Sequence, residues 1–180
     1  MPQYAAFLRA VNVGGRVVKM EALRTVFGRM GFSNVQTLIA SGNVMFDASQ
    51  RSAARIEQAI ENGLEEALGF TVTTFVRTDA ELTALVQHPL LSKESLEDGQ
   101  SLYVAFVREK PSPATTKKLT ALKTAGEDFE VHGAHVLWLV RGRFSDSALS
   151  GPALERTLGV PTTVRNATTV RKMVDKFRAG

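Results

Sequence analysis

The chain contains one pattern of elements twice, and this duplication limits the folds that it can adopt. Residues 103–108 read Tyr-Val-Ala-Phe-Val-Arg and match residues 4–9, Tyr-Ala-Ala-Phe-Leu-Arg, almost letter for letter. The glycines keep the same order, with Gly31, Gly42 and Gly69 corresponding to Gly126, Gly133 and Gly159. A chance resemblance between two strands would not also align helix ends and turns, so we infer two copies of one unit.

Periodicity predicts the elements of each copy. In the first half we expect strands at 4–9, 35–39, 43–47 and 71–77 and helices at 20–30 and 50–68. In the second half we expect a strand at 103–108, a helix at 113–124, a hairpin turning at Gly133-Ala134, a helix at 146–158 and a strand at 162–165. Gly42-Asn43 predicts a tight turn, and left-handed glycines after apolar runs predict three helix ends, at Gly31, Gly69 and Gly159.

The order βαββαβ is typical of the ferredoxin-like split βαβ arrangement. We therefore predict an α+β protein of two tandem ferredoxin-like repeats with antiparallel sheets, at residues 1–77 and 101–165. Residues 78–100 form a linking helix, begun by a capping box of Thr78 and Glu81, and a polar linker. Residues 166–180 form a basic helix docked on the body, capped by Thr168 or Thr169 and burying Val170, Met173, Val174 and Phe177.

Composition excludes several classes of chemistry. The 180 residues contain no cysteine, so disulfides, thiolate metal sites and a cysteine nucleophile are ruled out. No apolar run is long enough to cross a bilayer and the first residues do not resemble a secretion signal, so we expect a cytoplasmic protein without a membrane partner. His132 and His135 flank a turn but lack a third ligand, and we expect no metal and no cofactor. Trp138 is expected in the core.

The predicted topology brings two polar phrases to one end of the first sheet. Strand one ends where strand three begins, so the loop at 10–18, the hairpin tip at 41–43 and the start of the first helix share that end. Free helix amides, a diglycine loop and nearby cations suit a phosphate or carboxylate. The candidate ligand-binding residues there are Arg9, Asn12, Gly14, Gly15, Lys19, Ser41, Gly42 and Asn43. The alternative is that glycine and asparagine only serve the turns.

The charge distribution leaves the partner open. Residues 1–31 and 165–180 each contain five Lys and Arg against one acidic residue, while the middle of the chain is acidic. Basic ends suit a small anionic molecule, but they also suit nucleic acid or serve only solubility. The strand aromatics do not follow the pattern of RNA-binding sheets. A structural or oligomeric interaction module is a third class, and the oligomeric state stays open.

The phrases Leu8 to Gly15, Ser41 to Phe46 and 163–172 resemble a bacterial family labelled domain of unknown function 1697. The resemblance covers the whole chain and implies a fold and a set of positions, but no reaction. The matching positions are Arg9, Asn12, Gly14, Gly15, Ser41, Gly42, Asn43, Arg165, Asn166, Thr169 and Lys172. Ala10 stands where the family usually has glycine, and Ala167 where it usually has tryptophan.

The residues together suggest a binding site rather than a reaction. We expect Arg9 and Lys19 to neutralise an anion such as a nucleotide or phosphorylated metabolite, and Arg165 and Asn166 to close the site. The sequence has no P-loop, no nucleophile elbow and no residue that stands out as a general base. Whether the protein is an enzyme is therefore left open.

Overall fold

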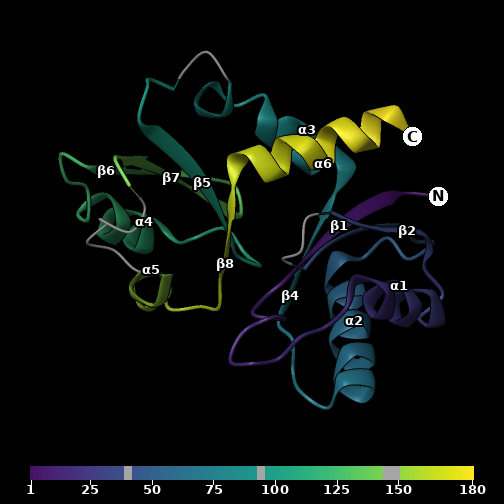
Figure 1. Ribbon diagram of the computed structural model, residues 1–180. Helices are drawn as coiled ribbons and strands as arrows, with labels where there is room; N and C mark the ends of the chain where they lie inside the picture. Colours follow the sequence, from purple (N-terminus) through teal and green to yellow (C-terminus); the bar gives the residue numbers. More distant parts are fainter. Residues whose placement is uncertain (39–41, 93–95, 144–150) are drawn as a thin grey trace. The chain divides into compact units, whose positions relative to one another are not determined.

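The computed structural model describes residues 1–38, 42–92, 96–143 and 151–180. These residues form two compact units, the first of residues 1–83 with 172–180 and the second of residues 84–171. Each unit is built on one four-stranded sheet (Figure 1). Among the described residues, no helix has the length and apolar character that crossing a membrane requires.

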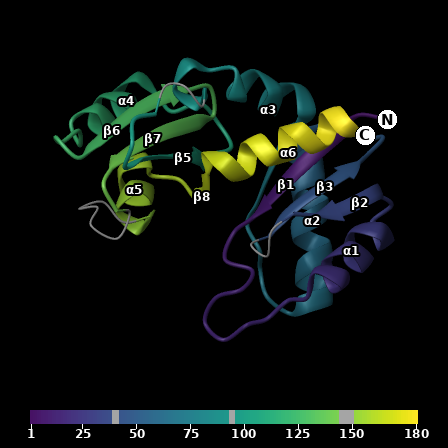
Figure 2. The same cartoon turned by 45° about the horizontal axis from the view of Figure 1, so that its top comes forward.

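The first unit has the predicted order of elements. These are β1 (Gln3–Leu8), α1 (Met20–Arg29), β2 (Ser33–Thr37), β3 (Asn43–Asp47), α2 (Ala53–Leu68) and β4 (Thr74–Thr78). The strand order is β2-β3-β1-β4, and all neighbours are antiparallel. Helices α1 and α2 lie together on one face of this sheet (Figure 2). The first repeat is therefore ferredoxin-like, with β1 and β3 in the centre.

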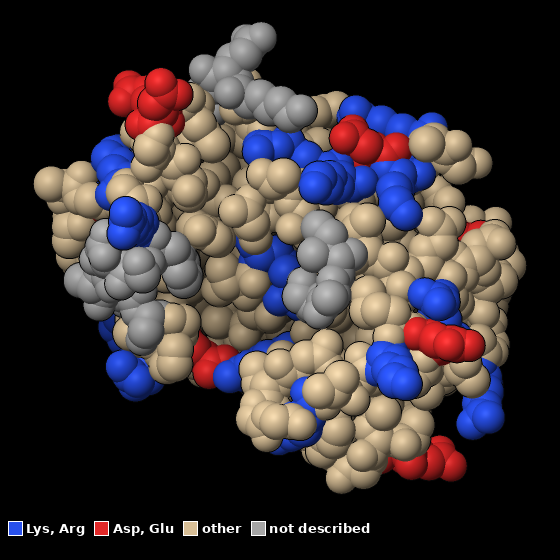
Figure 3. Space-filling model, in the orientation of Figure 1, with Lys and Arg blue, Asp and Glu red and all other residues tan. Residues whose placement is uncertain are grey.

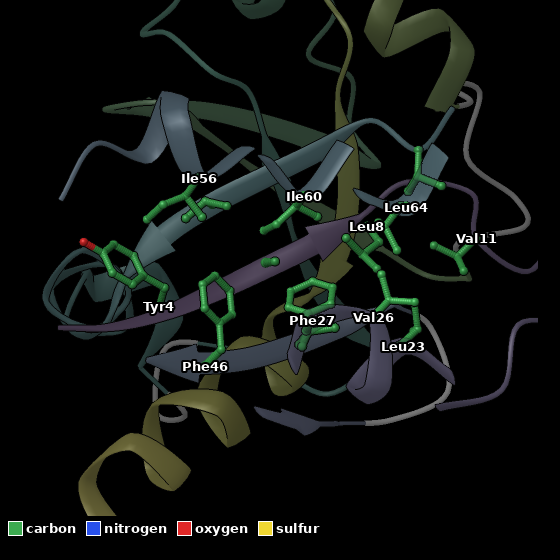
Figure 4. Close-up of a cluster of buried hydrophobic side chains, with 14 of the residues drawn as sticks. Tyr4, Leu8, Val11, Leu23, Val26, Phe27, Phe46, Ile56, Ile60 and Leu64 are labelled. Carbon is green, nitrogen blue, oxygen red and sulfur yellow. The ribbon is translucent and has the colours of Figure 1, made fainter. Parts of the chain in front are cut away.

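The core of this unit lies between the sheet and its two helices. Side chains from β1, β3, α1 and α2 point toward one another there (Figure 4). Ile56, Ile60 and Leu64, spaced by four along α2, are all fully buried. The rings of Phe27 and Phe46 meet edge to face with their centroids 5.5 Å apart. Burial of each of these side chains contributes about 2 kcal/mol to the free energy of unfolding. The apolar residues that periodicity identifies on the helices therefore supply much of the hydrophobic stabilisation of this unit.

The opposite face of the first sheet is buried as well. Ala5, Phe7, Met45 and Phe75 point to that face and are at most 6% exposed. Their strands therefore read as nearly continuous apolar runs instead of alternating with polar residues.

The second unit repeats this architecture. Its elements are β5 (Gln100–Phe106), α4 (Pro113–Thr120), β6 (Glu127–His132), β7 (His135–Arg141), α5 (Gly151–Leu158) and β8 (Thr163–Asn166), in the sheet order β6-β7-β5-β8. Trp138 lies in its core as predicted, with no exposed surface. The indole Nε1 donates a hydrogen bond of 2.9 Å to Oε2 of the buried Glu127, so the polar group of Trp138 is satisfied.

A helix follows the last strand of each repeat. These helices are α3 (Asp79–Val86), which precedes the short helix η1 (Pro89–Leu91), and α6 (Ala167–Ala179). The Thr78–Glu81 capping box forms as predicted, with Thr78 Oγ1 accepting from Glu81 N and Glu81 Oε2 accepting from Thr78 N. The predicted cap of the final helix is wrong, because Asn166 Oδ1 accepts from Thr168 N and the helix has begun before Thr168.

Helix α6 has the amphipathic character that the sequence predicts. Its four apolar residues at the predicted positions are buried. Basic side chains gather over α6 on the face shown in Figure 3. The exposed basic residues of this helix are Lys172, Lys176 and Arg178.

The register of the strands corrects two details of the repeat. Phe7 pairs with Asn43 and Phe106 pairs with His135, so Asn43 corresponds to His135 and Gly42 corresponds to Ala134, not to Gly133. Gly42 has the positive φ of the predicted turn, and the strand predicted at 43–47 is confirmed, but the turn is not centred on Gly42-Asn43 because Asn43 is the first residue of β3. The predicted hairpin turn in the second repeat lies at the expected place, between the paired residues His132 and His135.

The three glycines predicted to end helices have the expected backbone conformation, whereas some helix bounds differ from the prediction. Gly31, Gly69 and Gly159 have φ values of 86°, 79° and 72°, as the predicted left-handed helix ends require. Helix α2 begins three residues later than predicted because Ser52 Oγ accepts from Arg55 N and caps it there. Helix α4 ends at Thr120, earlier than the predicted end at 124. Residues 146–150 of the predicted helix at 146–158 lie outside the described residues.

Carboxylates from the helices cap the backbone of the last strand in each repeat. Glu57 Oε1 accepts from Val76 N and Glu61 Oε1 accepts from Thr74 N, each at 2.9 Å. In the second repeat Glu155 Oε1 accepts from Thr162 N, directly before β8, also at 2.9 Å. β4 and β8 are edge strands, and these bonds occupy amides that would otherwise be open to pairing with another chain.

Candidate functional site

The end of β1 and the start of β3 lie directly against each other. Leu8 N donates a hydrogen bond of 2.8 Å to Gly42 O. Gly42 is buried with φ of 74°, and a Cβ on it would lie 3.0 Å from both Cβ and O of Leu8 and 3.3 Å from Cγ2 of Val11. The structure thus brings the segment that leaves β1 next to the hairpin end, and only glycine fits at position 42 without displacing its neighbours.

The segment from Ala10 to Lys19 forms an open loop before α1. Three of its residues have positive φ: Ala10 at 55°, Gly14 at 64° and Gly15 at 81°. Asn12 Oδ1 accepts a hydrogen bond of 2.7 Å from Val18 N, which ties the two ends of the loop together. Gly14 and Gly15 are exposed, and no described atom lies within 4 Å of a Cβ placed on either. The backbone of the diglycine is therefore accessible to a ligand.

Three cations belong to this loop or border it. Lys19 is exposed and occupies the N-cap position of α1, and among the described residues its side chain makes no capping hydrogen bond. Arg9 is half-buried, and its backbone N donates to Thr73 O at 2.9 Å. The guanidinium carbon of Arg16 lies 4.3 Å from the centre of the Phe70 ring, a cation–π contact. Arg16 was not among the predicted site residues, because its partner lies 54 residues away and no local pattern signals the contact.

The two asparagines of the predicted site hold the backbone in place. Asn43 is fully buried, and its Nδ2 donates a hydrogen bond of 3.1 Å to Leu38 O. Leu38 N in turn donates to Asn43 O at 3.0 Å, so the residue closes the mouth of the β2–β3 hairpin. The side chain of Asn12 fixes the β1–α1 loop in the same way. Ser41, the remaining hairpin residue of the predicted site, lies outside the described residues.

The other predicted residues lie around β8 and α6. Arg165 Nη1 donates to Thr163 Oγ1 at 2.8 Å and to Val164 O at 3.1 Å, and burial lowers the pKa of Arg165 to about 10. Asn166 caps α6, Thr169 is half-buried on it, and Lys172 is exposed. Arg165, Asn166 and Thr169 belong to the second unit. That these residues close a site on the first sheet stays a prediction.

Arg77 is the residue of the first repeat that corresponds to Arg165, and it was not among the predicted site residues. Ala5 pairs with Arg77 as Val104 pairs with Arg165. Arg77 Nη1 donates to Val76 O at 2.8 Å, as Arg165 does to its preceding carbonyl. Burial lowers the pKa of Arg77, while the carboxylates of Glu81 and Glu57 oppose this effect. The signal was present in the sequence, in the matching Thr-Phe-Val-Arg and Thr-Thr-Val-Arg segments.

The histidines have structural partners. His88 Nε2 lies 3.1 Å from Glu130 Oε1, and His88 Nδ1 accepts from Leu90 N. His135 Nδ1 lies 3.1 Å from the backbone O of His132. Within residues 1–38, 42–92, 96–143 and 151–180, no group of three or more His, Asp or Glu side chains is placed to hold a metal ion.

Comparisons with known proteins place the chain in a family. Residues 1–137 match the family model described as Protein of unknown function (DUF1697). The chain belongs to this family. The structure resembles that of the conserved bacterial protein SP0830 from Streptococcus pneumoniae, with a TM-score of 0.76, 20% sequence identity and coverage of 99% of each chain. This likeness shows the fold alone. A search of curated proteins found no match.

Membership of the DUF1697 family gives one departure in this chain a structural meaning. Ala10 stands where the resemblance leads us to expect glycine, and its φ is 55°. An alanine in this left-handed conformation is strained, whereas glycine is not. A glycine at position 10 would therefore remove backbone strain at the point where this chain leaves β1.

Proposed function

We propose that this DUF1697 protein binds a small anionic ligand, a nucleotide or a phosphorylated metabolite, at the end of its first sheet. The ligand would contact the backbone amides near Gly14 and Gly15, while the side chains of Arg9 and Lys19 balance its charge. We further propose that binding occurs in the bacterial cytoplasm, where such metabolites are present.

One observation carries the proposal: the exposed diglycine with positive φ at both residues lies in a loop with cations on each side. Consecutive backbone N–H groups in such a loop form a concave surface that attracts anions. The start of α1 adds the partial positive charge of a helix N-terminus. Gly14 and Gly15 are the central residues of a turn in which Arg16 N donates to Val13 O at 3.2 Å, and this turn accounts for their positive φ values. The exposure of both glycines and the cations beside them are the features that support a ligand.

The rest of the site supplies rigidity. Asn12 and Asn43 fix the loop and the hairpin through hydrogen bonds to the backbone. Gly42 allows these two segments to touch, and Arg16 anchors the loop on Phe70. A site held in one geometry before binding loses less conformational entropy when the ligand arrives.

Amide chemical shifts test the proposal directly. Inorganic phosphate, AMP and glucose 6-phosphate are titrated separately into ¹⁵N-labelled protein, and we expect the Gly14 and Gly15 amides to shift with at least one of them. Lys19→Gln removes one charge from the site and weakens binding about fivefold or more, corresponding to about 1 kcal/mol. Arg24→Gln is the control, because Arg24 lies on α1 and bonds to Thr37 Oγ1. Absence of loop shifts with all three compounds contradicts the proposal.

The exposed basic residues of α6 favour nucleic acid as the alternative ligand (Figure 3). Binding to a phosphate backbone through Lys172, Lys176 and Arg178 predicts an affinity for a short RNA that falls steeply with salt. It also predicts that Lys176→Gln weakens binding while Lys19→Gln does not. A structural or oligomeric module would show neither response.

A further inference from the structure

A pocket lies in the second unit, lined by the loop that follows β5 and by the end of α5. Its volume is about 520 Å³. Pockets that bind small molecules typically measure roughly 300 to 1,000 Å³. The pocket belongs to the second repeat alone and does not involve the loop of the proposed anion site.

Both charged and apolar residues line this pocket. Arg108, Glu109 and Lys110 line it from the loop after β5, and Leu158, Val160 and Pro161 line it from the end of α5 and the residues that follow. The three charged residues sum to a single positive charge, which matches a ligand with one negative charge. Val160 is 46% exposed, so a ligand that covers it removes apolar surface from water.

The apolar side is held rigidly. Gly159 turns the chain at the end of α5 with φ of 72°, and its N–H donates to Glu155 O at 2.8 Å. Glu155 Oε1 accepts from Thr162 N, and Thr162 Oγ1 donates to Phe106 O at 2.8 Å. These bonds anchor both ends of the segment that presents Val160.

The polar side is equally constrained. Pro111 and Pro113 fix the φ angles on either side of Ser112. Ser112 Oγ accepts from Thr115 N at 3.1 Å and lies 3.0 Å from Thr115 Oγ1. This loop takes the place that the diglycine loop occupies in the first repeat, but its prolines replace flexible residues with rigid ones.

We propose that this pocket binds a small organic monocarboxylate with an apolar body. The carboxylate meets the Arg108 and Lys110 side, and the apolar body covers Val160 and Pro161. A phosphate monoester carries close to two negative charges at neutral pH and fits the single net charge less well. The two repeats then bind different ligands through equivalent loops, so this site does not depend on the proposed function of the first.

Hexanoate is the probe, with hexanol and inorganic phosphate as matched comparisons. Each is titrated into the full-length ¹⁵N-labelled protein, and dissociation constants are taken from the amide shifts. We expect hexanoate to shift the amides of Lys110, Thr115 and Val160, and to bind at least fivefold more tightly than either comparison compound. If hexanol binds as tightly as hexanoate, the carboxylate has no role. If inorganic phosphate binds as tightly as hexanoate, the apolar body has no role. Absence of shifts at these amides refutes the site.

Two variants test the charged and the apolar lining residues of the pocket separately. Lys110→Gln and Val160→Asn are each expected to weaken hexanoate binding about fivefold, with the remaining amide spectrum unchanged. Lys117→Gln is the control, because Lys117 is exposed on α4, the helix that contributes Thr115 to the lining, and does not itself line the pocket. Equal binding by all three variants overturns the proposal, even if hexanoate binds the parent protein.

Discussion

Replacing Gly42 with alanine tests the packing on which the candidate anion site depends. Gly42 has φ of 74°, and an added Cβ would lie 3.0 Å from both Cβ and O of Leu8. The backbone atoms of Leu8 cannot move freely, because β1 is a central strand that pairs with β3 on one side and β4 on the other. The substitution therefore strains the backbone and forces β1 and the hairpin apart.

The expected cost follows from two effects. A left-handed conformation costs alanine roughly 1–2 kcal/mol relative to glycine. Overpacking against fixed neighbours adds roughly 1–3 kcal/mol. We expect Gly42→Ala to lower the free energy of unfolding of the first unit by about 3 kcal/mol, or about a hundredfold in the equilibrium constant. Gly133→Ala is the matched control, because Gly133 has φ of 59° but no described atom within 4 Å of its Cβ position. It should cost about 1 kcal/mol.

Amide exchange measures the effect where it occurs. Leu8 N–H donates to Gly42 O, so its protection should fall about a hundredfold in Gly42→Ala, measured under conditions where exchange reports the opening equilibrium. Urea unfolding followed by the fluorescence of Trp138, the one tryptophan of the chain, reports the second unit and serves for Gly133→Ala. If Gly42→Ala costs no more than Gly133→Ala, the hairpin end does not pack on β1 and the reasoning fails.

Three further changes have definite expected outcomes. Ala10→Gly relieves a φ of 55° and should raise the free energy of unfolding by about 0.5–1 kcal/mol; an unchanged or lower thermal midpoint would contradict this. Glu57→Ala removes the buried acceptor of Val76 N and should cost about 2–3 kcal/mol in urea unfolding, whereas a neutral effect would show that this edge bond is dispensable. The hydrogen bond from Lys123 lowers the pKa of Asp128, so their ion pair stabilises the fold above the ordinary value of 3.8 and is lost as pH falls through the lowered pKa. Because Asp128 is 41% exposed, this contribution stays below about 1 kcal/mol, and the stability difference between Asp128→Asn and the parent should vanish at low pH; a difference that persists there has another cause.

Local patterns were enough to predict which elements form and in what order. The spacing of Ile56, Ile60 and Leu64 and the helix-ending glycines are visible in short windows, because helix burial and left-handed glycines depend mainly on neighbouring residues. Turn and cap positions were predicted less accurately than the order of the elements. Asn43 is a good turn residue, but pairing with Phe7 places it inside β3. Asn166 caps the final helix in place of Thr168, because β8 ends at Asn166 and the helix begins at the next residue.

The arrangement of the candidate site could be predicted from the sequence only in part. Topology alone placed the β1–α1 loop beside the β3 hairpin end, and the structure contains that juxtaposition. The roles of individual side chains depended on partners far away in the chain. The contact of Arg16 with Phe70 and the burial of Asn43 against the Leu38 backbone could not be predicted from spacing.

The sequence by itself determined a duplicated α+β chain, its core-facing residues and the loop that carries the diglycine. These features follow from hydrophobic periodicity and from backbone preferences, which act between near neighbours. The tertiary structure decided which polar groups are hydrogen-bonded within the protein and which surfaces are exposed to solvent. Only the folded chain shows the carboxylates that cap the edge strands and the pocket beside α4, because both arise where segments distant in sequence meet.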